Sequence, residues 1–335
     1  MSQIDRERNA WNACRFVRDN RGGHYESYFQ RANHPERPLA FWIRYTVFSP
    51  KNRPEAALGE LWAIYFDGEA GRITATKQQV PIGECELSTT GLNVRLGAAT
   101  LTDVALEGSA ASNGHRLQWK LSYAGTAPPL LLLPRSAYGM GFPKAKALVG
   151  TPNASYSGVL TVDATEIPID GWPGSQNHNW GSQHTDEYAW GQVSGFDNAP
   201  DAFFECSTAR VRLGSLWTPW LTMLVLRVEG QEYMLNSYVQ AVRAYARFQF
   251  FTWHMDSQGA DLRVHGQIAA PAGSFVGLRY DNPPGGIKTC LNTKLASCQI
   301  VLERTDAPPL RLSSSHRAAF EILTDKSDHG VEIVA

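Results

Sequence analysis

The sequence predicts an antiparallel all-β protein built from two barrels or sandwiches, and three observations carry this prediction. Short segments rich in β-branched and aromatic residues recur along the chain, separated by turn residues at fairly regular intervals. Helical periodicity is weak, and the strands follow one another without intervening helices, which is typical of antiparallel sheets. Both halves open with an aromatic-rich strand, a loop containing proline and a strand that carries a lone glutamate. This last observation indicates two units of similar build.

Composition limits the possible partners. The chain has 335 residues, of which 43% are hydrophobic and 19% charged, so two domains with sizeable cores are within reach. A net charge of −1, without basic blocks among the aromatics, gives no reason to expect nucleic acid as a partner. Five cysteines without a CxxC pair are typical of free thiols in a reducing compartment. Whether Cys290 and Cys298 pair across a turn stays open.

Targeting signals are not evident in the sequence. The N-terminus is charged over residues 5–8, unlike a signal peptide, and the most apolar run, residues 130–133, is too short to cross a bilayer. We therefore expect a soluble, cytoplasmic protein.

The first half is expected to form one barrel over residues 1–172, with a short leading helix. Ala10, Ala13, Cys14 and Val17 lie at helical spacing. From residue 25 the pattern changes to strands, which we expect at 41–48, 60–66, 72–77, 91–96, 105–107, 117–123 and 156–162.

Two charges in this half share strand faces with large apolar groups. Period-two alternation puts Arg44 on the face of Trp42, and Glu60 on the face of Trp62. A charge in such surroundings is costly unless it has a partner. We therefore expect Arg44 and Glu60 to form a buried ion pair between neighbouring strands.

The second barrel is expected over residues 173–335. Its strands are predicted at 188–196, 202–213, 218–229, 233–239, 260–268, 277–280, 299–303, 318–323 and 330–334. Glu205 shares an inward face with Phe203 and Ser207 and has no obvious basic partner. A carboxyl there, with a raised pKa, would suit a general acid. The alternative is a carboxyl that hydrogen-bonds a Trp or Tyr and does nothing else.

Residues 176–192 form the most informative stretch, because polar groups able to transfer protons alternate with large aromatics. The stretch is either a corner, in which Trp180 and Trp190 fill a core, or the wall of an apolar pocket. On the pocket interpretation His178 and Glu205 are the candidate catalytic residues. The candidate ligand-binding residues are Asn177, Asn179, Trp180, Gln183, His184, Tyr188, Trp190 and Gln192.

No cofactor motif accompanies this stretch. His178, His184, Asp186 and Glu187 are residue types that ligate metals, but their spacing matches no known pattern, so no metal is expected. The sequence also lacks a P-loop, a dinucleotide-binding glycine fingerprint and a nucleophile elbow. We expect no cofactor.

The central stretch resembles a known signature. Asn179-Trp180-Gly181, followed by residues 188–192, resembles the Asn-Trp-Gly, Trp-x-Trp, Gln pattern of tocopherol cyclases. The stretch from His178 is also similar to the carotenoid 1,2-hydratases and the AttH-like proteins grouped with them, and residues 25–64 are similar to the first half of that group.

This resemblance implies two lipocalin-like β-barrels, with the motif near their junction or in a barrel mouth. It also implies cofactor-free chemistry on a long apolar isoprenoid: an alkene is protonated, and water or an internal hydroxyl adds to the cation. Trp180 and Trp190 would stabilise that cation through their ring faces.

The sequence departs from the signature in three places. Tyr188 replaces the first Trp of the pair, Asn177 stands where hydratases carry Asp, and His178 stands where tocopherol cyclases carry Lys. An amide cannot protonate an alkene. The proton donor would therefore be His178, Glu205, Asp186 or Glu187.

Three functions stay open. The first is a hydratase, cyclase or isomerase acting on an isoprenoid- or polyketide-like molecule; the second is a non-catalytic lipocalin-like carrier; the third, suggested by Trp and Tyr content, binds or cleaves carbohydrate. A deep pocket with both Glu205 and His178 would favour the enzyme. The expected partner is a hydrophobic small molecule, and a transient contact with a membrane surface is compatible with such a ligand. The sequence does not determine the oligomeric state.

Overall fold

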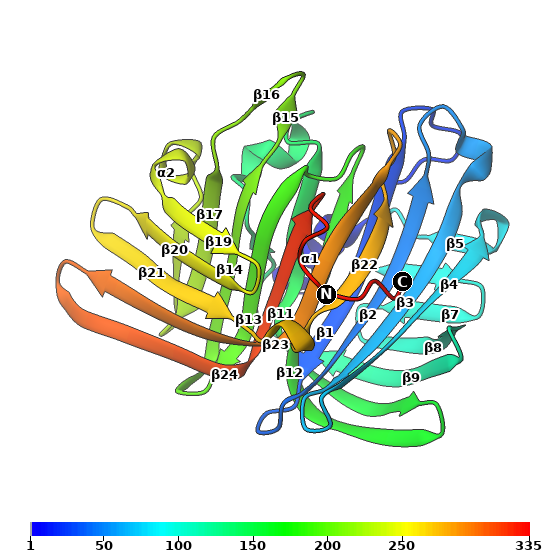
Figure 1. Ribbon diagram of the computed structural model, residues 1–335, viewed down its shortest axis with the longest axis horizontal. Coiled ribbons are helices and arrows are strands. Elements are labelled where there is room, and N and C mark those ends of the chain that lie inside the picture. The colour runs from blue at the N-terminus through cyan, green and yellow to red at the C-terminus, as the bar shows by residue number, and fades with distance from the viewer. Residues whose placement is uncertain (1) are drawn as a thin grey trace.

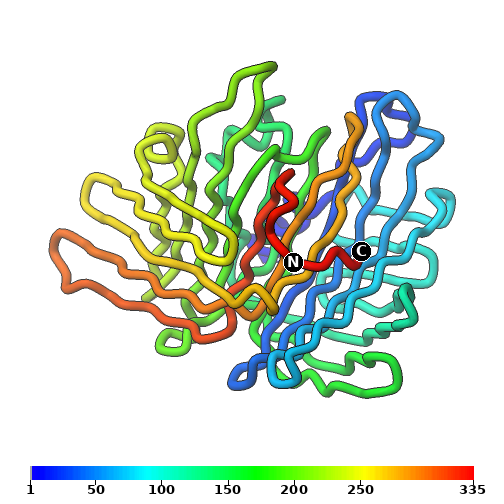
Figure 2. Tube along the Cα trace, viewed as in Figure 1, coloured from blue at the N-terminus to red at the C-terminus, as the bar shows by residue number. Residues whose placement is uncertain are grey.

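The computed structural model describes residues 2–335 and is almost entirely β (Figure 1). Strands hold 63% of the residues, and helices, with short 3-10 turns included, hold 9%. Two curled antiparallel sheets lie side by side, one a nearly closed barrel and the other a half-barrel. The predicted all-β fold of two lipocalin-like barrels is confirmed. Figure 2 shows that the chain completes the first sheet before it enters the second.

The first sheet is closed by a long hairpin that returns the chain to its first strand. Its order is β4-β3-β2-β1-β12-β11-β9-β8-β7-β6-β5, and β10 pairs with β11. The bounds are β1 His24–Asn33, β2 Leu39–Ser49, β3 Leu58–Asp67, β4 Arg72–Pro81, β5 Cys85–Leu87, β6 Asn93–Leu96, β7 Ala99–Thr102, β8 Ala105–Ser112, β9 His115–Ala124, β10 Leu130–Leu131, β11 Ala145–Val162 and β12 Thr165–Gly181.

The second sheet starts at β13 and has the order β18-β17-β14-β13-β24-β23-β21-β20-β19, with β22 paired to β23. A separate hairpin is formed by β15 and β16. The bounds are β13 Glu187–Phe196, β14 Ala199–Arg210, β15 Arg212–Leu213, β16 Leu216–Trp217, β17 Leu221–Val228, β18 Gln231–Leu235, β19 Tyr245–Gln249, β20 Thr252–Gln258, β21 Leu262–Ala269, β22 Val276–Asp281, β23 Ile287–Arg304 and β24 Ala307–Thr324.

Two helices accompany the sheets. The leading helix α1 (Gln3–Asn12) begins at a capping box between Ser2 and Asp5. A second capping box, between Ser237 and Gln240, starts α2 (Tyr238–Arg243), so the strand expected at 233–239 stops early, at Leu235. The 3-10 turns are Pro54–Ala56, Ile82–Glu84, Arg135–Gly139 and Ala272–Ser274. None of the helices within residues 2–335 is long and apolar enough to cross a membrane.

The strands differ in how many faces they bury. In β9 the inward residues, including Leu117 and Trp119, are buried and the alternate residues are exposed. Trp119 donates its indole N–H to the Tyr45 hydroxyl across the first barrel at 2.7 Å, which satisfies both polar groups in the core. In contrast, every residue of β2 is buried. Its outer face is covered because the second sheet packs against it, with Tyr280 edge-on to Trp62 of the adjoining β3.

The boundary between the units is later in the chain than expected. The sequence predicts it after residue 172, yet β12 runs to Gly181 and pairs with β1, so residues 173–181 belong to the first sheet. At Gly174 a Cβ atom would lie 2.0 Å from the carbonyl oxygen of Arg31, so glycine is needed there for close strand approach.

Two side-chain expectations are answered by the strand order. Cys290 and Cys298 lie on the same strand, β23, and all five cysteines are buried and free. The Arg44–Glu60 ion pair is wrong, because Glu60 pairs instead with Lys77 of β4 at 2.8 Å. β4 is the other neighbour of β3, and the sequence did not show which neighbour supplies the partner. Arg44 lies over the ring of Tyr280 from the second sheet.

Candidate active site

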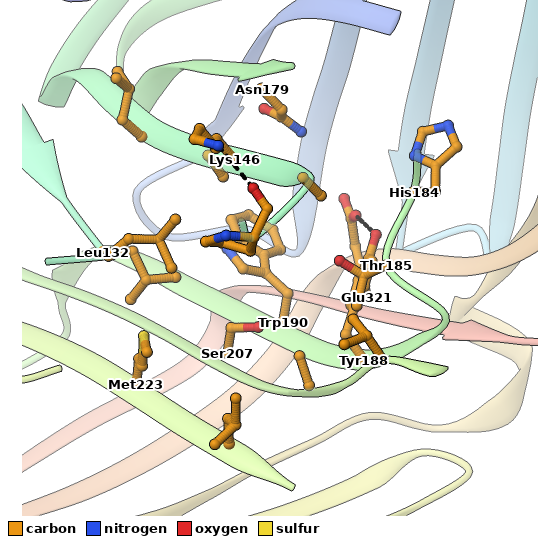
Figure 3. A pocket seen from close by; sticks show the side chains of 18 of the residues that line it. Leu132, Lys146, Asn179, His184, Thr185, Tyr188, Trp190, Ser207, Met223 and Glu321 are labelled. Carbon is orange, nitrogen blue, oxygen red and sulfur yellow. Dashed lines mark hydrogen bonds between the residues drawn. The ribbon is translucent and has the colours of Figure 1, made fainter. Parts of the chain in front are cut away.

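A cavity of about 190 Å³ lies between the two sheets, lined by side chains from both (Figure 3). The first sheet contributes Tyr25, Phe29, Trp42 and Arg44 from β1 and β2, and residues of β11 and β12. The second contributes residues of β13, β14, β17, β22 and β24. The site is therefore at the junction of the barrels, rather than inside either one.

Strand alternation decides which side chains reach this cavity. On β14, Phe204 and Cys206 point into the core of the second sheet, whereas Glu205 and Ser207 line the cavity. The shared face of Glu205 and Ser207 was correctly predicted. That face, however, is directed at the first sheet and not at the interior of the second barrel. Trp190 of β13, opposite Ser207 in register, also lines the cavity.

One wall of the cavity is aromatic. Phe29 contacts the ring of Trp190 edge-on at a centroid distance of 6.0 Å, and the ring of Trp42 at 6.1 Å. Behind the two indoles, Lys294 places its Nζ atom 5.7 Å from each ring. This lysine is neutralised by Glu321, at 2.7 Å. The wall therefore offers a ligand a continuous aromatic surface.

Glu205 is the acidic group in this wall with an unengaged oxygen. Its side chain is buried, and Oε1 accepts a hydrogen bond from Trp190 Nε1 at 3.0 Å. Oε2 has no hydrogen-bond partner among residues 2–335. Burial raises the pKa of Glu205 to about 7, and the hydrogen bond from Trp190, the charge of Arg31 and the nearby amide of Gln192 offset only part of that rise. The carboxyl is therefore partly protonated near neutral pH.

The motif asparagines line the cavity in two different states. Asn177 is held in place, because its Oδ1 accepts a hydrogen bond from Gln192 at 2.8 Å and its Nδ2 donates to Ser175 at 2.9 Å. Asn179 is buried in part, and its Oδ1 has no partner in the described part of the chain. Asn179 is thus available to a ligand or a water molecule, whereas Asn177 and Gln192 form a fixed support. Gln192 itself does not line the cavity.

The loop between β12 and β13 covers one end of the site. His184 stacks on Tyr25 at 4.0 Å, and burial followed by the charge of Arg44 lowers its pKa to about 3, so its ring stays neutral. Figure 3 shows Tyr188 beside Glu321; its hydroxyl donates to that carboxylate at 3.5 Å. Gln183 does not line the cavity and accepts a hydrogen bond from Lys144 instead.

His178 and Trp180 do not line the cavity, so the expectation that they share it with Glu205 is wrong. Both lie within β12, and alternation turns them away from the face of Asn177 and Asn179. His178 is fully buried, with Nε2 2.8 Å from Glu26 and Nδ1 2.9 Å from the Trp11 carbonyl. Neither ring nitrogen is free to act on a substrate.

The Glu26 carboxylate next to His178 is surrounded by donors. Burial alone would raise its pKa, but hydrogen bonds from His178 and His24 outweigh burial and hold the pKa below its ordinary range. It also accepts the backbone N–H of Arg15 at 2.9 Å and the hydroxyl of Tyr28 at 3.3 Å. This cluster fastens the N-terminal segment to the first sheet.

The remaining acidic candidates are already paired near the rim. Asp186 accepts the backbone N–H of Arg212 at 2.8 Å, and Glu187 pairs with Arg210 at 2.6 Å. Of the four proposed donors, Glu205 is the one that the structure places in the cavity. No three His, Cys, Asp or Glu side chains within residues 2–335 are grouped so as to hold a metal ion.

Sequence reasoning missed several residues of the site. Tyr280 and Glu321 come from strands far along the chain, and nothing in the sequence indicates that they face the first sheet. Arg44 did show a signal, since its alternation with Trp42 placed it on an apolar face, but we assigned it to a structural ion pair.

Fold and site together define a protein of two lipocalin-like barrels with an acid-bearing, largely apolar cavity at their junction. Solved structures with the same architecture include a putative AttH from Nitrosomonas europaea, with a TM-score of 0.57 and 12% identity over 93% of this chain and 97% of that one. Kievitone hydratase from Nectria haematococca has a TM-score of 0.56 and 10% identity, over 91% and 90% of the two chains. CghA, solved with Sch210972, has a TM-score of 0.55 and 10% identity, over 92% and 89%. The resemblance to the AttH-like group is confirmed at the level of fold.

Two sequence relatives match most of the chain, but their names give no activity. Uncharacterized proteins of Mycobacterium tuberculosis, Rv0493c of strain H37Rv and MT0513 of strain CDC 1551, are each 24% identical over 284 residues. The match covers 84% of this chain and 82% of each relative. No family model matches the sequence.

Proposed function

We propose that this protein binds an apolar, alkene-bearing small molecule between its barrels and hydrates, cyclises or isomerises it by cofactor-free acid catalysis. Glu205 is the acid. The observation that carries the proposal is the geometry of this carboxyl: it is buried in an aromatic cavity, with one oxygen held by Trp190 and the other free. The architecture shared with kievitone hydratase and CghA supports the same class of reaction.

The geometry orients the acid. Because the Trp190 indole donates to Oε1, that oxygen acts as an acceptor, and the proton of the neutral acid is carried by Oε2. Transfer of this proton to one alkene carbon leaves a cation at the other carbon and a carboxylate at Glu205. The ring faces of Phe29, Trp42 and Trp190 stabilise that cation.

The carboxylate then completes the cycle. In hydration, a water molecule held by Asn179 Oδ1 adds its oxygen to the cation and returns a proton to Glu205, so that the net change is addition of one water. In cyclisation, a hydroxyl or a second alkene of the substrate takes the place of water. Isomerisation requires only loss of a different proton from the cation to Glu205.

Two further features fit this function. The five free, buried cysteines support a reducing, cytoplasmic compartment. Exposed apolar side chains, Leu213 and Leu216 on the β15–β16 hairpin and Val239 and Val242 on α2, lie beside cavity-lining Thr218 and Tyr238 in the chain. They support a transient contact with a membrane surface, from which an apolar substrate would enter.

The test uses a panel of polyenes and prenylated phenols in heavy water. Turnover by Glu205 would place one non-exchangeable deuterium on carbon, with the mass of one water gained in a hydration and none in a cyclisation. The Glu205→Gln variant keeps the shape of the site and should bind without turnover. Binding without turnover by the parent across the panel would favour the carrier instead.

A further inference from the structure

Arg44 is a buried cation that lines the cavity without an anionic partner. The residue is 5% exposed, and no carboxylate within residues 2–335 forms an ion pair with it. Its Nε has no hydrogen-bond partner there either. The guanidinium lies 4.5 Å from the centre of the Tyr280 ring, a cation–π contact that compensates only part of the lost hydration. A buried charge normally has a partner.

A second buried arginine shows that the fold can satisfy such a group. Arg31 donates to Gln192 Oε1 at 2.9 Å, to Asn33 Oδ1 at 2.9 Å and to Ser194 Oγ at 3.3 Å, so its fork is filled by the protein. For Arg44 the carboxylate nearest in the strand pattern, Glu60, is occupied by Lys77. Arg44 therefore differs from Arg31 in keeping an open fork, and it does so in the wall of the cavity.

The other charged groups of the cavity leave this cation uncompensated. Lys146 is itself a cation, and its Nζ donates to the backbone carbonyls of Met140 and Pro143 at 2.8 and 2.7 Å. Glu321 is neutralised by Lys294, and Glu205 has its pKa raised to about 7 by burial. His184, which lies close to Arg44, is neutral and does not compete for an anion. The cavity thus carries a positive, fork-shaped donor at one place and a partly protonated acid at another.

We propose that Arg44 is an oxyanion-binding subsite, and that the ligand is an apolar molecule with an ionised carboxylate or enolate at one end. A guanidinium fork binds such a group with two parallel hydrogen bonds. The rings of Trp42, Phe29 and Trp190 follow one another from Arg44 to Glu205. The acidic end lies on Arg44, the apolar body crosses these rings, and the alkene reaches Glu205. The last placement rests on the proposed function; the anion subsite does not.

Matched acids and esters test this subsite directly. Geranic and farnesoic acids and their methyl esters are titrated calorimetrically into the parent protein, well above the pKa of a carboxylic acid. The parent should bind at least one acid roughly tenfold or more tightly than its ester, the size expected of a charge-assisted hydrogen bond. Arg44→Met should bring acid and ester within about threefold of each other and leave ester affinity unchanged.

Arg210→Met is the matched control, because Arg210 also lines the cavity but is paired with Glu187. It should keep the preference for the acid. Equal binding of acid and ester by the parent, a preference that persists in Arg44→Met, or failure of every acid to bind would overturn the subsite. Glu205→Gln separates the two proposals: the preference for the acid should survive in this variant even if the parent shows no turnover at all.

Discussion

Two buried carboxylates, Glu26 and Glu205, differ in almost every respect except burial. Glu26 is 0% exposed and Glu205 is 2% exposed. Glu26 accepts hydrogen bonds from two histidines, a tyrosine and a backbone N–H, and its pKa is held below its ordinary range. Glu205 accepts one, from Trp190, and burial raises its pKa to about 7. The number of donors, and not the depth of burial, decides whether a carboxylate is a structural anion or a usable acid.

The two groups also lie in different surroundings. Glu26 is enclosed between the N-terminal segment and the first sheet, where its donors join distant parts of the chain. Glu205 faces a cavity, where leaving one oxygen unsatisfied costs roughly 1–3 kcal/mol of stability. One more hydrogen-bond donor beside Glu205 would remove this cost. The absence of such a donor among the described residues is consistent with a carboxyl group that is kept available for chemistry.

The largest expected effect is on catalytic activity, which should depend on Glu205. Glu205→Gln removes the transferable proton and should lower kcat by about 10²–10⁴-fold, the usual contribution of a general acid. Ligand affinity should stay within a few-fold, since the amide keeps the shape. Steady-state kinetics and calorimetry measure these, with the circular dichroism spectrum as the control for folding. A variant that turns over like the parent would remove Glu205 from the mechanism.

The next largest effect is on stability, in which the Glu26 and Glu205 variants should differ. Glu26→Gln breaks a buried, multiply bonded pair with His178 and should cost roughly 3–5 kcal/mol, whereas Glu205→Gln should cost little or stabilise. Urea denaturation at neutral pH, followed by tryptophan fluorescence, gives both values. Equal losses in the two variants would contradict the distinction between them.

The pH dependence of stability should have opposite signs for the two groups. The pKa of Glu205 rises on folding from 4.5 to about 7. Its contribution to the free energy of unfolding is therefore complete below pH 4.5 and is lost as the pH rises to about 7. The loss is roughly 3 kcal/mol, at about 1.4 kcal/mol per pKa unit. Glu26, whose pKa falls on folding, stabilises above 4.5 and loses that contribution as pH falls. Unfolding measured against pH should show a Glu205-dependent slope between 4.5 and 7, absent in Glu205→Gln.

The smallest expected effect tests the one donor to Glu205. Trp190→Phe removes the indole N–H that stabilises the carboxylate form, so the pKa of Glu205 should rise further, by about 1–2 units. The alkaline limb of the pH–rate profile should move up accordingly. Trp180→Phe is the control, because Trp180 lies on the far side of β12, away from the cavity. A shift of the same size in both variants would show that the effect is not local.

Much of this geometry was predictable wherever alternation alone decides it. The prediction that Glu205 shares a strand face with Ser207, and Arg44 with Trp42, was correct. Side chains alternate between the two faces of a strand, so these positions follow once the strand is recognised. His178 was misplaced because β12 was not recognised as a strand. Gly174 of this strand permits close packing against the backbone of Arg31.

What the sequence could not show is the direction of each face. Strands such as β2 are buried on both sides, so an apolar face does not indicate whether it points into its own barrel or toward the other one. The same limit explains the error at Arg44 and Glu60. Both neighbours of β3 offer a basic residue, and only the packing of the second sheet directs Arg44 to Tyr280 and leaves Lys77 for Glu60.

The most direct test of the central claim is the protonation of Glu205 itself. Infrared difference spectra of the parent against Glu205→Gln, recorded as a function of pH without ligand, isolate the carbonyl stretch of this one carboxylic acid. We expect that band to be present in mildly acidic solution and to disappear with a midpoint near pH 7. A midpoint near 4.5, the ordinary value for a glutamic acid, would mean that Glu205 is ionised at neutral pH and is not the acid of this site.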